Sequence, residues 1–265
     1  MAEELRDIEL LRPLLSRKPF AILSDIDGTL APIVPNPEEA RISPRARDAI
    51  RQLIRQGVRV AFITGRALEK AQSMVNIPEA YFAANHGLHI AASGDTSTPE
   101  EVWPYVEWAR QVIHDASHRN LPGVTVEDKG AVVAFHYRRA NSDEEARAAI
   151  RAAVAASEAA AHFRVQEGRK VIELRPPLAI DKGTAVGTLV RQIGAKSVLA
   201  IGDDTTDLDM FRGVRDLREA GISGASVAVW SDEVEALVLE STDYFVRGVE
   251  GVEWLLEELA KALPP

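Results

Sequence analysis

Two aspartates stand at the end of an apolar run near the start of the chain. The run Phe20-Ala21-Ile22-Leu23-Ser24 is followed by Asp25-Ile26-Asp27-Gly28-Thr29. A short apolar segment that stops at acids and a glycine is typical of a buried parallel strand ending at a functional edge. Residues two apart on a strand face the same way, about 6.5 Å apart, so Asp25 and Asp27 can serve one site. Such a pair can bind a divalent cation, or divide the roles of nucleophile and acid/base.

The same pentapeptide can also form a simple turn. Asp side chains after a strand often bond to nearby backbone groups in this way, and that alternative stays open on these residues alone. A calcium loop of the EF-hand type does not fit. Its fifth and sixth positions require an Asx residue and a glycine, whereas this chain has Thr29 and Leu30 there.

A second acidic cluster follows another apolar run, 197–201. Its sequence is Gly202-Asp203-Asp204-Thr205-Thr206-Asp207. In open α/β sheets, ligands bind at the carboxyl ends of the strands, so the two acidic strand ends can converge. Clustered carboxylates in a chain without cysteine suit Mg²⁺. The alternative is a helix cap with an acidic first turn, but three acids would then repel one another in one turn.

Two further segments supply groups that can bind an anion. Thr64 ends an apolar run, and its hydroxyl with the backbone N–H of Gly65 at a helix start suits a phosphate. Lys182 opens another segment, and its ammonium can neutralise a phosphoryl oxygen. Individually, Thr64 can be a simple cap and Lys182 a surface charge. Together with the acids, they indicate phosphate-ester chemistry.

The elements that carry these residues alternate between strand and helix. A helix is predicted from Pro44, capped by Ser43, to near Gly57, because its apolar residues have core spacing. A buried strand over 58–64, a helix to about Val75 and a strand over 81–84 follow. This alternation predicts a parallel sheet with right-handed crossovers.

The middle of the chain has a different rhythm. Helices are predicted over about 100–118 and from 141 to about 161. The first precedes strands 124–127 and 131–137, which flank the turn Asp128-Lys129-Gly130. The second precedes strands 163–166 and 171–174, which flank Glu167-Gly168-Arg169. This αββαββ order predicts an antiparallel sheet with helices on one face, an α+β module.

The α/β pattern then returns with a helix over 181–193, strands over 197–201, 226–229 and 244–246, and a last helix over 252–263. The predicted fold class is therefore α/β, a Rossmann-like parallel sheet core with an inserted α+β cap domain. The core is predicted to comprise residues 1–99 and 178–265, and the cap residues 100–177.

Composition excludes several function classes. The 265 residues are 46% hydrophobic and 27% charged, as in ordinary globular proteins, and the net charge of −9 argues against a nucleic-acid binder. The chain has no cysteine, which excludes thiolate catalysis and fits the cytoplasm. The N-terminus is too charged for a secretory signal, and no apolar run spans a membrane. No exposed apolar heptad suggests an oligomer, so we expect a monomer.

Four segments together resemble the motifs of the haloacid dehalogenase superfamily of phosphotransferases: Asp25-x-Asp27-Gly28-Thr29, Thr64-Gly65-Arg66, Lys182, and Gly202-Asp203-Asp204-x-x-Asp207. The insert is similar to that superfamily's C2-type cap. The resemblance implies that Asp25 attacks phosphorus and that Asp27 is the acid/base. It also implies that Thr64 and Lys182 hold phosphoryl oxygens. Mg²⁺ would be bound by Asp25, the Asp27 carbonyl and Asp203, with Asp204 and Asp207 as further ligands, direct or through water.

Substrate specificity must come from the cap, since the core motifs address only the phosphoryl group. Glu127, Lys129 and Glu173 can supply acceptors and donors to sugar hydroxyls, although charges that protect a sheet edge are the alternative. The strings VEDKG, FHYR, EGRKVIELRPP and GDDTTDLDMF resemble the trehalose-6-phosphate phosphatases. That resemblance implies that Glu127, Lys129 and Glu173 contact the glucose units. It also places Asn85-His86-Gly87 below the substrate, and Gly65 and Arg66 are expected to bind the substrate as well.

One residue departs from this pattern, Leu208, where the family usually has Glu. It lies outside the expected metal ligands. The expected reaction is hydrolysis of trehalose 6-phosphate through an aspartyl-phosphate. The alternatives are a related sugar phosphatase or phosphomutase acting on sucrose phosphate, mannosyl-phosphoglycerate or a hexose phosphate, and a non-catalytic sugar-phosphate sensor. Intact motifs argue against the sensor, which has no need of a general acid at Asp27.

Overall fold

The structure, a computed structural model, describes residues 2–92, 95–168, 170–232 and 234–264. It divides into two compact units. We call residues 1–97 with 180–265 the core unit, and residues 98–179 the cap unit. The predicted boundaries were 99/100 and 177/178.

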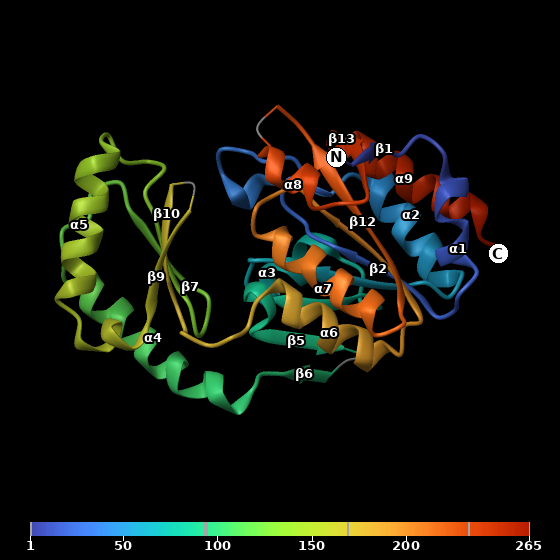
Figure 1. The fold of residues 1–265 in the computed structure, drawn as a ribbon. Helices are drawn as coiled ribbons and strands as arrows, with labels where there is room; N and C mark the ends of the chain where they lie inside the picture. Colours follow the sequence, from blue (N-terminus) through green and yellow to red (C-terminus); the bar gives the residue numbers. More distant parts are fainter. Residues whose placement is uncertain (1, 93–94, 169, 233, 265) are drawn as a thin grey trace. The chain divides into compact units, whose positions relative to one another are not determined.

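The core unit is built on one sheet, and Figure 1 shows its strands running side by side. The pairs β4–β5 and β5–β6 are antiparallel, and the other pairs are parallel. In spatial order the strands are β1 (Glu3–Glu4), β13 (Tyr244–Arg247), β12 (Ser223–Trp230), β11 (Ser197–Gly202), β2 (Phe20–Ser24), β3 (Arg59–Ile63), β4 (Tyr81–Ala84), β5 (His89–Ala92) and β6 (Asp95–Ser97).

The central strands are apolar on both faces because helices cover both faces. All residues of β2 and β11 are buried. Along β2, Ile22 packs into the core cluster on one side of the sheet, and Ala21 and Leu23 pack into the cluster on the other. The register pairs Ile201 with Ser24, so the two strands end next to each other. The acids that follow each strand are therefore neighbours.

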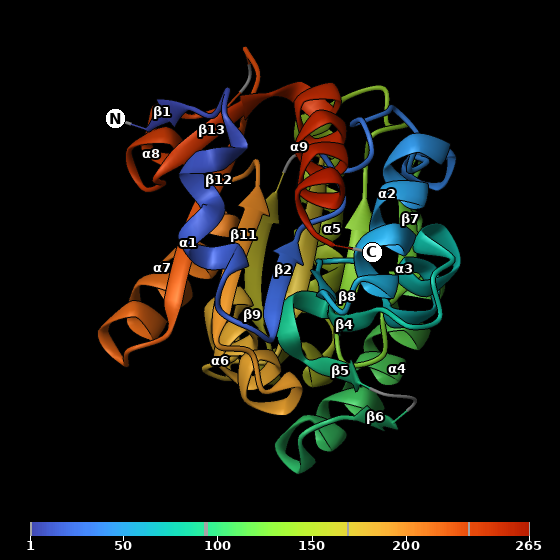
Figure 2. The same ribbon diagram turned by 90° about the vertical axis from the view of Figure 1, so that its right-hand side faces the viewer.

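Helices form a layer on each face of this sheet (Figures 1 and 2). One layer contributes Ile50, Val75 and Leu256 to its core cluster, and the other contributes Leu189 and Phe211. The first layer contains α1 (Arg12–Leu15), α2 (Pro44–Arg55), α3 (Leu68–Val75) and α9 (Gly248–Ala262). The second contains α6 (Lys182–Ile193), α7 (Asp207–Glu219) and α8 (Ala236–Glu240). This three-layer arrangement confirms the predicted α/β core.

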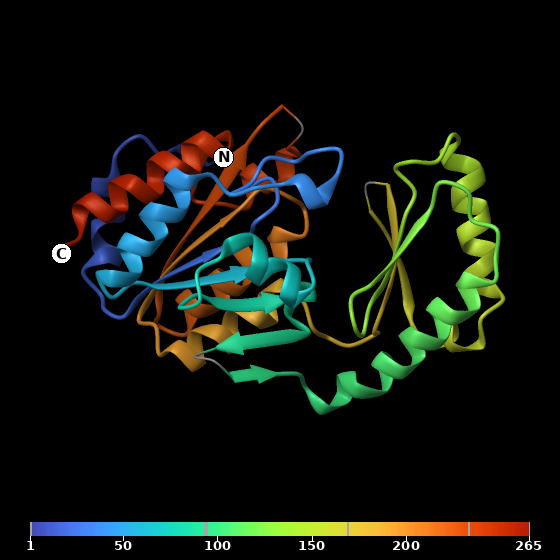
Figure 3. The same ribbon diagram turned by 180° about the vertical axis from the view of Figure 1, so that it is seen from behind.

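The cap unit has the order helix, two strands, helix, two strands (Figures 1 and 3). Its antiparallel sheet buries Phe135, Ile172 and Leu174 against helices on one face, while the other face is polar. The elements are α4 (Trp103–Ser117), β7 (Thr125–Asp128), β8 (Val133–His136), α5 (Asp143–Ala155), β9 (Arg164–Gly168) and β10 (Val171–Arg175), with the sheet order β7-β8-β10-β9. Part of one predicted turn, Arg169, lies outside the described residues.

Some element boundaries differ from the predictions. The helix expected to reach about 161 ends at Ala155, because Ser157 leaves helical geometry and donates a partly buried hydrogen bond to Asp115. A 3-10 turn, Glu158–His162, follows. Strand β12 begins three residues before the predicted 226, and α9 four residues before the predicted 252. Among the described residues, no helix is both long and apolar enough to cross a membrane.

Strands β5 and β6 were not predicted. They extend the sheet as antiparallel strands because the chain reverses directly after β4. The reversal uses left-handed backbone at His86, with φ 58°, and at Gly87, with φ 108°. Asn85, with φ 49°, shares this backbone conformation. Non-glycine residues adopt it uncommonly, which is why the sequence pattern does not reveal the hairpin.

Candidate active site

Asp25 and Lys182 form a buried pair at the carboxyl end of β2. The backbone N–H of Asp25 donates to the carbonyl of Ile201 at 2.9 Å, so the residue continues the pairing of β2 with β11. Lys182 is the first residue of α6, which starts at a capping box between Asp181 and Thr184. Its Nζ donates to Oδ1 of Asp25 at 2.9 Å and to Oδ1 of Asp207 at 2.6 Å. A cation from one helix therefore bridges two acids that are far apart in sequence.

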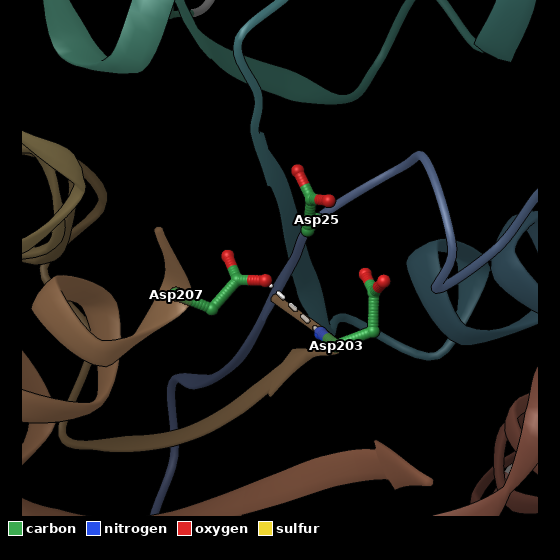
Figure 4. Close-up of side chains that lie close together, drawn as sticks. All are labelled: Asp25, Asp203 and Asp207. Carbon is green, nitrogen blue, oxygen red and sulfur yellow. Dashed lines mark hydrogen bonds between the residues drawn. The ribbon is translucent and has the colours of Figure 1, made fainter. Parts of the chain in front are cut away.

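Asp207 stabilises the loop after β11 by side-chain hydrogen bonds to its backbone. Its Oδ2 accepts the backbone N–H groups of Asp203 at 3.0 Å and Asp204 at 3.1 Å, while Oδ1 accepts from Lys182. Figure 4 shows the bond to Asp203. A Cβ on Gly202 would lie 2.4 Å from Cγ of Asp207, so the glycine makes this approach possible. Both oxygens of Asp207 are thus occupied by protein donors, and the residue holds Asp203 in place.

Three carboxylates converge in this region, those of Asp25, Asp203 and Asp207 (Figure 4). One oxygen of each lies within 4.8 Å of the others. Asp203 is oriented by the hydroxyl of Thr29, which donates to its Oδ1 at 2.9 Å. The side chain of Asp204 accepts from Thr205 instead. The structure therefore brings together three of the five predicted metal residues by their side chains.

Burial and charge shift the ionisation of this cluster. Burial raises the pKa of Asp25 well above its usual range, although the nearby Lys182 lowers it. Burial and the neighbouring Asp207 raise the pKa of Asp203 to about 7. Burial lowers the pKa of Lys182, but the charges of Asp207 and Asp25 outweigh it and raise that pKa. When these clustered acids ionise, a cation between them offsets their mutual repulsion, and oxygen donors of this kind fit Mg²⁺.

The carboxylate of Asp27 is held by Arg66. The guanidinium donates through Nε to Oδ2 at 2.7 Å and through Nη2 to Oδ1 at 2.6 Å. Nη2 also donates to the carbonyl of Pro37 at 2.9 Å. Strand β2 ends at Ser24, so Asp27 lies in the following turn and not on the strand face that the sequence predicted. This bidentate geometry fixes the plane of the carboxylate.

The predicted phosphate and substrate segments of the core form one rim. The backbone N–H of His86 donates to the carbonyl of Thr64, and that of Asn85 donates to the carbonyl of Arg66, both at 2.9 Å. Thr64 is buried, and its hydroxyl accepts the N–H of Arg66 at 3.2 Å. A Cβ on Gly65 would lie 2.6 Å from Nε2 of His86. Backbone hydrogen bonds and close packing therefore hold the segments 64–66 and 85–87 against each other.

The predicted cap residues also meet one another. Nζ of Lys129 donates to Oε1 of Glu173 at 2.8 Å. Nε2 of His136 lies 2.8 Å from Oε2 of Glu127. His136 was not among the predicted site residues. The alternation of β8 is the signal that could have found it, because it places His136 on the face opposite to the buried Phe135.

Gly28 provides a test of how the acids are placed. Its φ is +83°, and a Cβ there would lie 1.9 Å from Oδ2 of Asp203. We expect Gly28→Ala to displace Asp203, to cost more than the roughly 1 kcal/mol of backbone strain alone, and to weaken metal binding. Gly57→Ala is the matched control, since its φ is +85° and no described atom lies within 4 Å of that Cβ. Urea unfolding of both variants measures the difference; equal losses would show that Asp203 accommodates the methyl group.

A model of the family described as trehalose-phosphatase matches residues 23–243. The chain is 33% identical to the trehalose-phosphate phosphatase of Mycobacterium leprae, over 84% of this chain and 54% of that protein. It is 30% identical to the probable trehalose-phosphate phosphatase 3 of Oryza sativa, over 92% of this chain and 70% of that protein. The chain thus spans about half the length of the mycobacterial relative.

Solved structures share the fold. The C-terminal domain of the Candida albicans trehalose-6-phosphate phosphatase is similar with a TM-score of 0.74 at 22% identity, over 98% of both chains. A protein described as related to trehalose-6-phosphate phosphatase has a TM-score of 0.73 at 20% identity, over 91% of this chain and 97% of that one. The family match covers most of the sequence and includes Asp25, Asp27, Thr64, Lys182 and the acids of 203–207. The chain therefore belongs to the trehalose-phosphatase family.

Proposed function

We propose that this protein is a Mg²⁺-dependent phosphatase that hydrolyses trehalose 6-phosphate to trehalose and phosphate. The observation that carries the proposal is the buried ammonium of Lys182 between Asp25 and Asp207, with Asp203 beside them. A cation next to a buried carboxylate makes that carboxylate a nucleophile that tolerates the approach of an anionic phosphoryl group. Family membership supplies the class of reaction.

In the proposed reaction, a carboxylate oxygen of Asp25 attacks phosphorus, and the P–O bond to the sugar breaks. Lys182 holds Oδ1 of Asp25, which leaves Oδ2 for the attack. For this step Asp27 must leave its bidentate contact with Arg66 and carry a proton. It gives that proton to the departing sugar oxygen and then takes one from the attacking water. The water oxygen bonds to phosphorus, phosphate leaves, and the carboxylate of Asp25 is restored. Thr64 and Lys182 hold the phosphoryl oxygens.

The metal residues in this proposal are Asp25, the backbone carbonyl of Asp27 and Asp203. Mg²⁺ bound there would supply Lewis-acid stabilisation of the phosphoryl charge. Asp207 already accepts three protein hydrogen bonds. We therefore propose that it acts by positioning Asp203 and Lys182, and that Asp204 interacts with the metal through water.

For the substrate, we propose that residues 100–177 act as the specificity cap and that Glu127, Lys129 and Glu173 bind the sugar. Carboxylates and an ammonium on one polar face offer acceptors and donors for many hydroxyls. The names of the relatives support a trehalose ester. A related sugar phosphatase or phosphomutase remains the second candidate. A monomeric state and a cytoplasmic location remain predictions from the sequence.

The direct test is phosphate release from trehalose 6-phosphate, sucrose 6-phosphate and glucose 6-phosphate, with and without Mg²⁺. We expect Mg²⁺-dependent release that is confined to the trehalose ester. Release from another ester alone would preserve the core chemistry and refute the assignment of the cap residues. The absence of release from all three would refute the proposed enzyme.

Metal affinity is expected to depend on pH near neutrality. Asp203 has a pKa of about 7 in the metal-free fold, against about 3.9 in an unfolded chain. The folded protein therefore binds more protons than the unfolded chain between these values, and its metal-free stability falls as pH rises through them. Mg²⁺ must displace that proton, so its affinity should weaken below pH 7 by up to about tenfold per pH unit.

Calorimetric titration with MgCl₂ between pH 6 and 8 measures this dependence. Repeating it in buffers of different ionisation enthalpy counts the protons released. A dissociation constant that stays the same from pH 6 to 8, with no proton release, would contradict the prediction.

A further inference from the structure

Two short contacts lie side by side on the polar face of the cap sheet. The register pairs Ala134 of β8 with Glu127 of β7 on one side and with Glu173 of β10 on the other. These three residues therefore form one row across the sheet, on the face opposite to the buried Phe135. Ala134 has a small side chain and is fully buried. The row therefore places one carboxylate on each side of this small residue.

Each carboxylate has its own partner. Glu173 accepts from Nζ of Lys129, and both side chains are nearly buried, with exposed fractions of 13% and 10%. Glu127 contacts His136, two residues beyond Ala134 on the same face of β8. The register places His136 opposite Thr125 and Val171, so it reaches Glu127 along a cross-strand diagonal, within the range of long side chains.

The Glu127–His136 pair is more exposed than the Glu173–Lys129 pair. The side chain of His136 is 33% exposed and that of Glu127 17% exposed. The histidine occupies Oε2 of Glu127 with Nε2 at 2.8 Å. A glutamate on a strand has several rotamers, and recognition of a sugar hydroxyl requires the carboxylate in one position. An aromatic ring on a central strand has few rotatable bonds and can fix that position at low entropic cost.

We propose that His136 is a positioning residue for Glu127, and that through it the cap discriminates a polyhydroxylated sugar ester from a simple phosphate ester. The inference rests on the proposed function, since it takes the row of Glu127 and Glu173 as the sugar-binding surface. It adds a residue that does not touch the reacting phosphoryl group. Its loss should therefore appear in substrate affinity rather than in turnover.

The test compares wild type, His136→Phe and His136→Gln with two substrates, trehalose 6-phosphate and p-nitrophenyl phosphate, in the presence of Mg²⁺. We expect His136→Phe to raise KM for the sugar ester by about tenfold, the effect of losing one hydrogen bond to a charged group, with kcat unchanged. Activity on p-nitrophenyl phosphate, which has no sugar hydroxyls, should not change. His136→Gln keeps a side-chain N–H donor and should recover most of the affinity.

His114→Phe is the matched control, because His114 lies exposed on α4, and it should leave both activities unchanged. In the background of Glu127→Gln, His136→Phe should have little further effect, because the two residues act as one unit. This double-mutant cycle compares the effect of His136→Phe with and without Glu127. It therefore tests the inference even where one of the single variants is less stable.

The possible outcomes separate the two proposals. A wild-type enzyme that hydrolyses p-nitrophenyl phosphate but not trehalose 6-phosphate refutes the proposed substrate, and the inference with it. A wild-type enzyme active on the sugar ester, combined with an unchanged KM in His136→Phe, refutes only the inference. Equal losses on both substrates would also refute it, because they would indicate a general structural effect.

Discussion

Replacing Asp25 by Asn is expected to lower the rate of phosphate release from trehalose 6-phosphate by at least about 10³-fold, since the amide cannot form the acyl phosphate. The fold should persist. The amide oxygen can still accept the hydrogen bond from Lys182, and Lys182 keeps its second partner, Asp207. The variant also removes one of the charges that crowd the cluster. Phosphate release with saturating Mg²⁺ measures the first effect, and urea unfolding the second.

Asp209→Asn provides the matched control for that experiment. It makes the same chemical change in the first turn of α7, where the side chain is 40% exposed and paired with Arg212. We expect nearly wild-type activity from this control. An Asp25→Asn enzyme with substantial turnover would show that another group attacks phosphorus.

Replacing Lys182 by Met is expected to abolish activity and also to destabilise the fold, by about 3–5 kcal/mol. Methionine keeps much of the side-chain volume but leaves Asp25 and Asp207 buried without their cation. Lys182 lowers the pKa of Asp25 in the native protein, so its loss raises that pKa further above the unfolded value. A raised pKa of an acid costs stability as pH increases. The loss should therefore be larger at pH 8 than at pH 6.

Urea unfolding at these two pH values measures the effect. Lys196→Met is the control, because Lys196 is exposed and a surface change of this kind should stay within about 0.5 kcal/mol. The double variant Asp25→Asn with Lys182→Met should be more stable than Lys182→Met alone, since one uncompensated charge is gone. If Lys182→Met unfolds at the wild-type urea concentration at both pH values, the assignment of a stabilising ion pair to this cluster is wrong.

Much of the core could be predicted from the sequence because its signals are local. The apolar runs that become β2 and β11 are short, bounded by acids and glycines, and buried on both faces. Parallel strands that alternate with helices align their carboxyl ends at one edge. The convergence of Asp25 with Asp203 follows from that rule, as does the proximity of Lys182 at the start of α6, the helix that precedes β11.

What the sequence could not decide was the partner of each side chain. Asp27 was expected on the strand face, yet the strand ends at Ser24 and the carboxylate turns to Arg66. Asp207 lies in the predicted carboxylate cluster, but it also accepts backbone N–H groups of its own loop, which no sequence pattern indicates. These choices depend on turn geometry after the strand, where neighbouring conformations differ by little energy and no periodic pattern exists.

The sequence by itself determined the class of fold, the order of its elements and the set of charged residues at the sheet edge, because hydrophobic periodicity and chain direction dictate them. Only the tertiary structure decided that Lys182 also bonds to Asp207, that Glu127 pairs with His136 on the adjacent strand, and where β5 and β6 extend the sheet. Those contacts join residues through strand register and left-handed turns. Register and turn geometry are settled by packing between distant segments, and not by the local sequence.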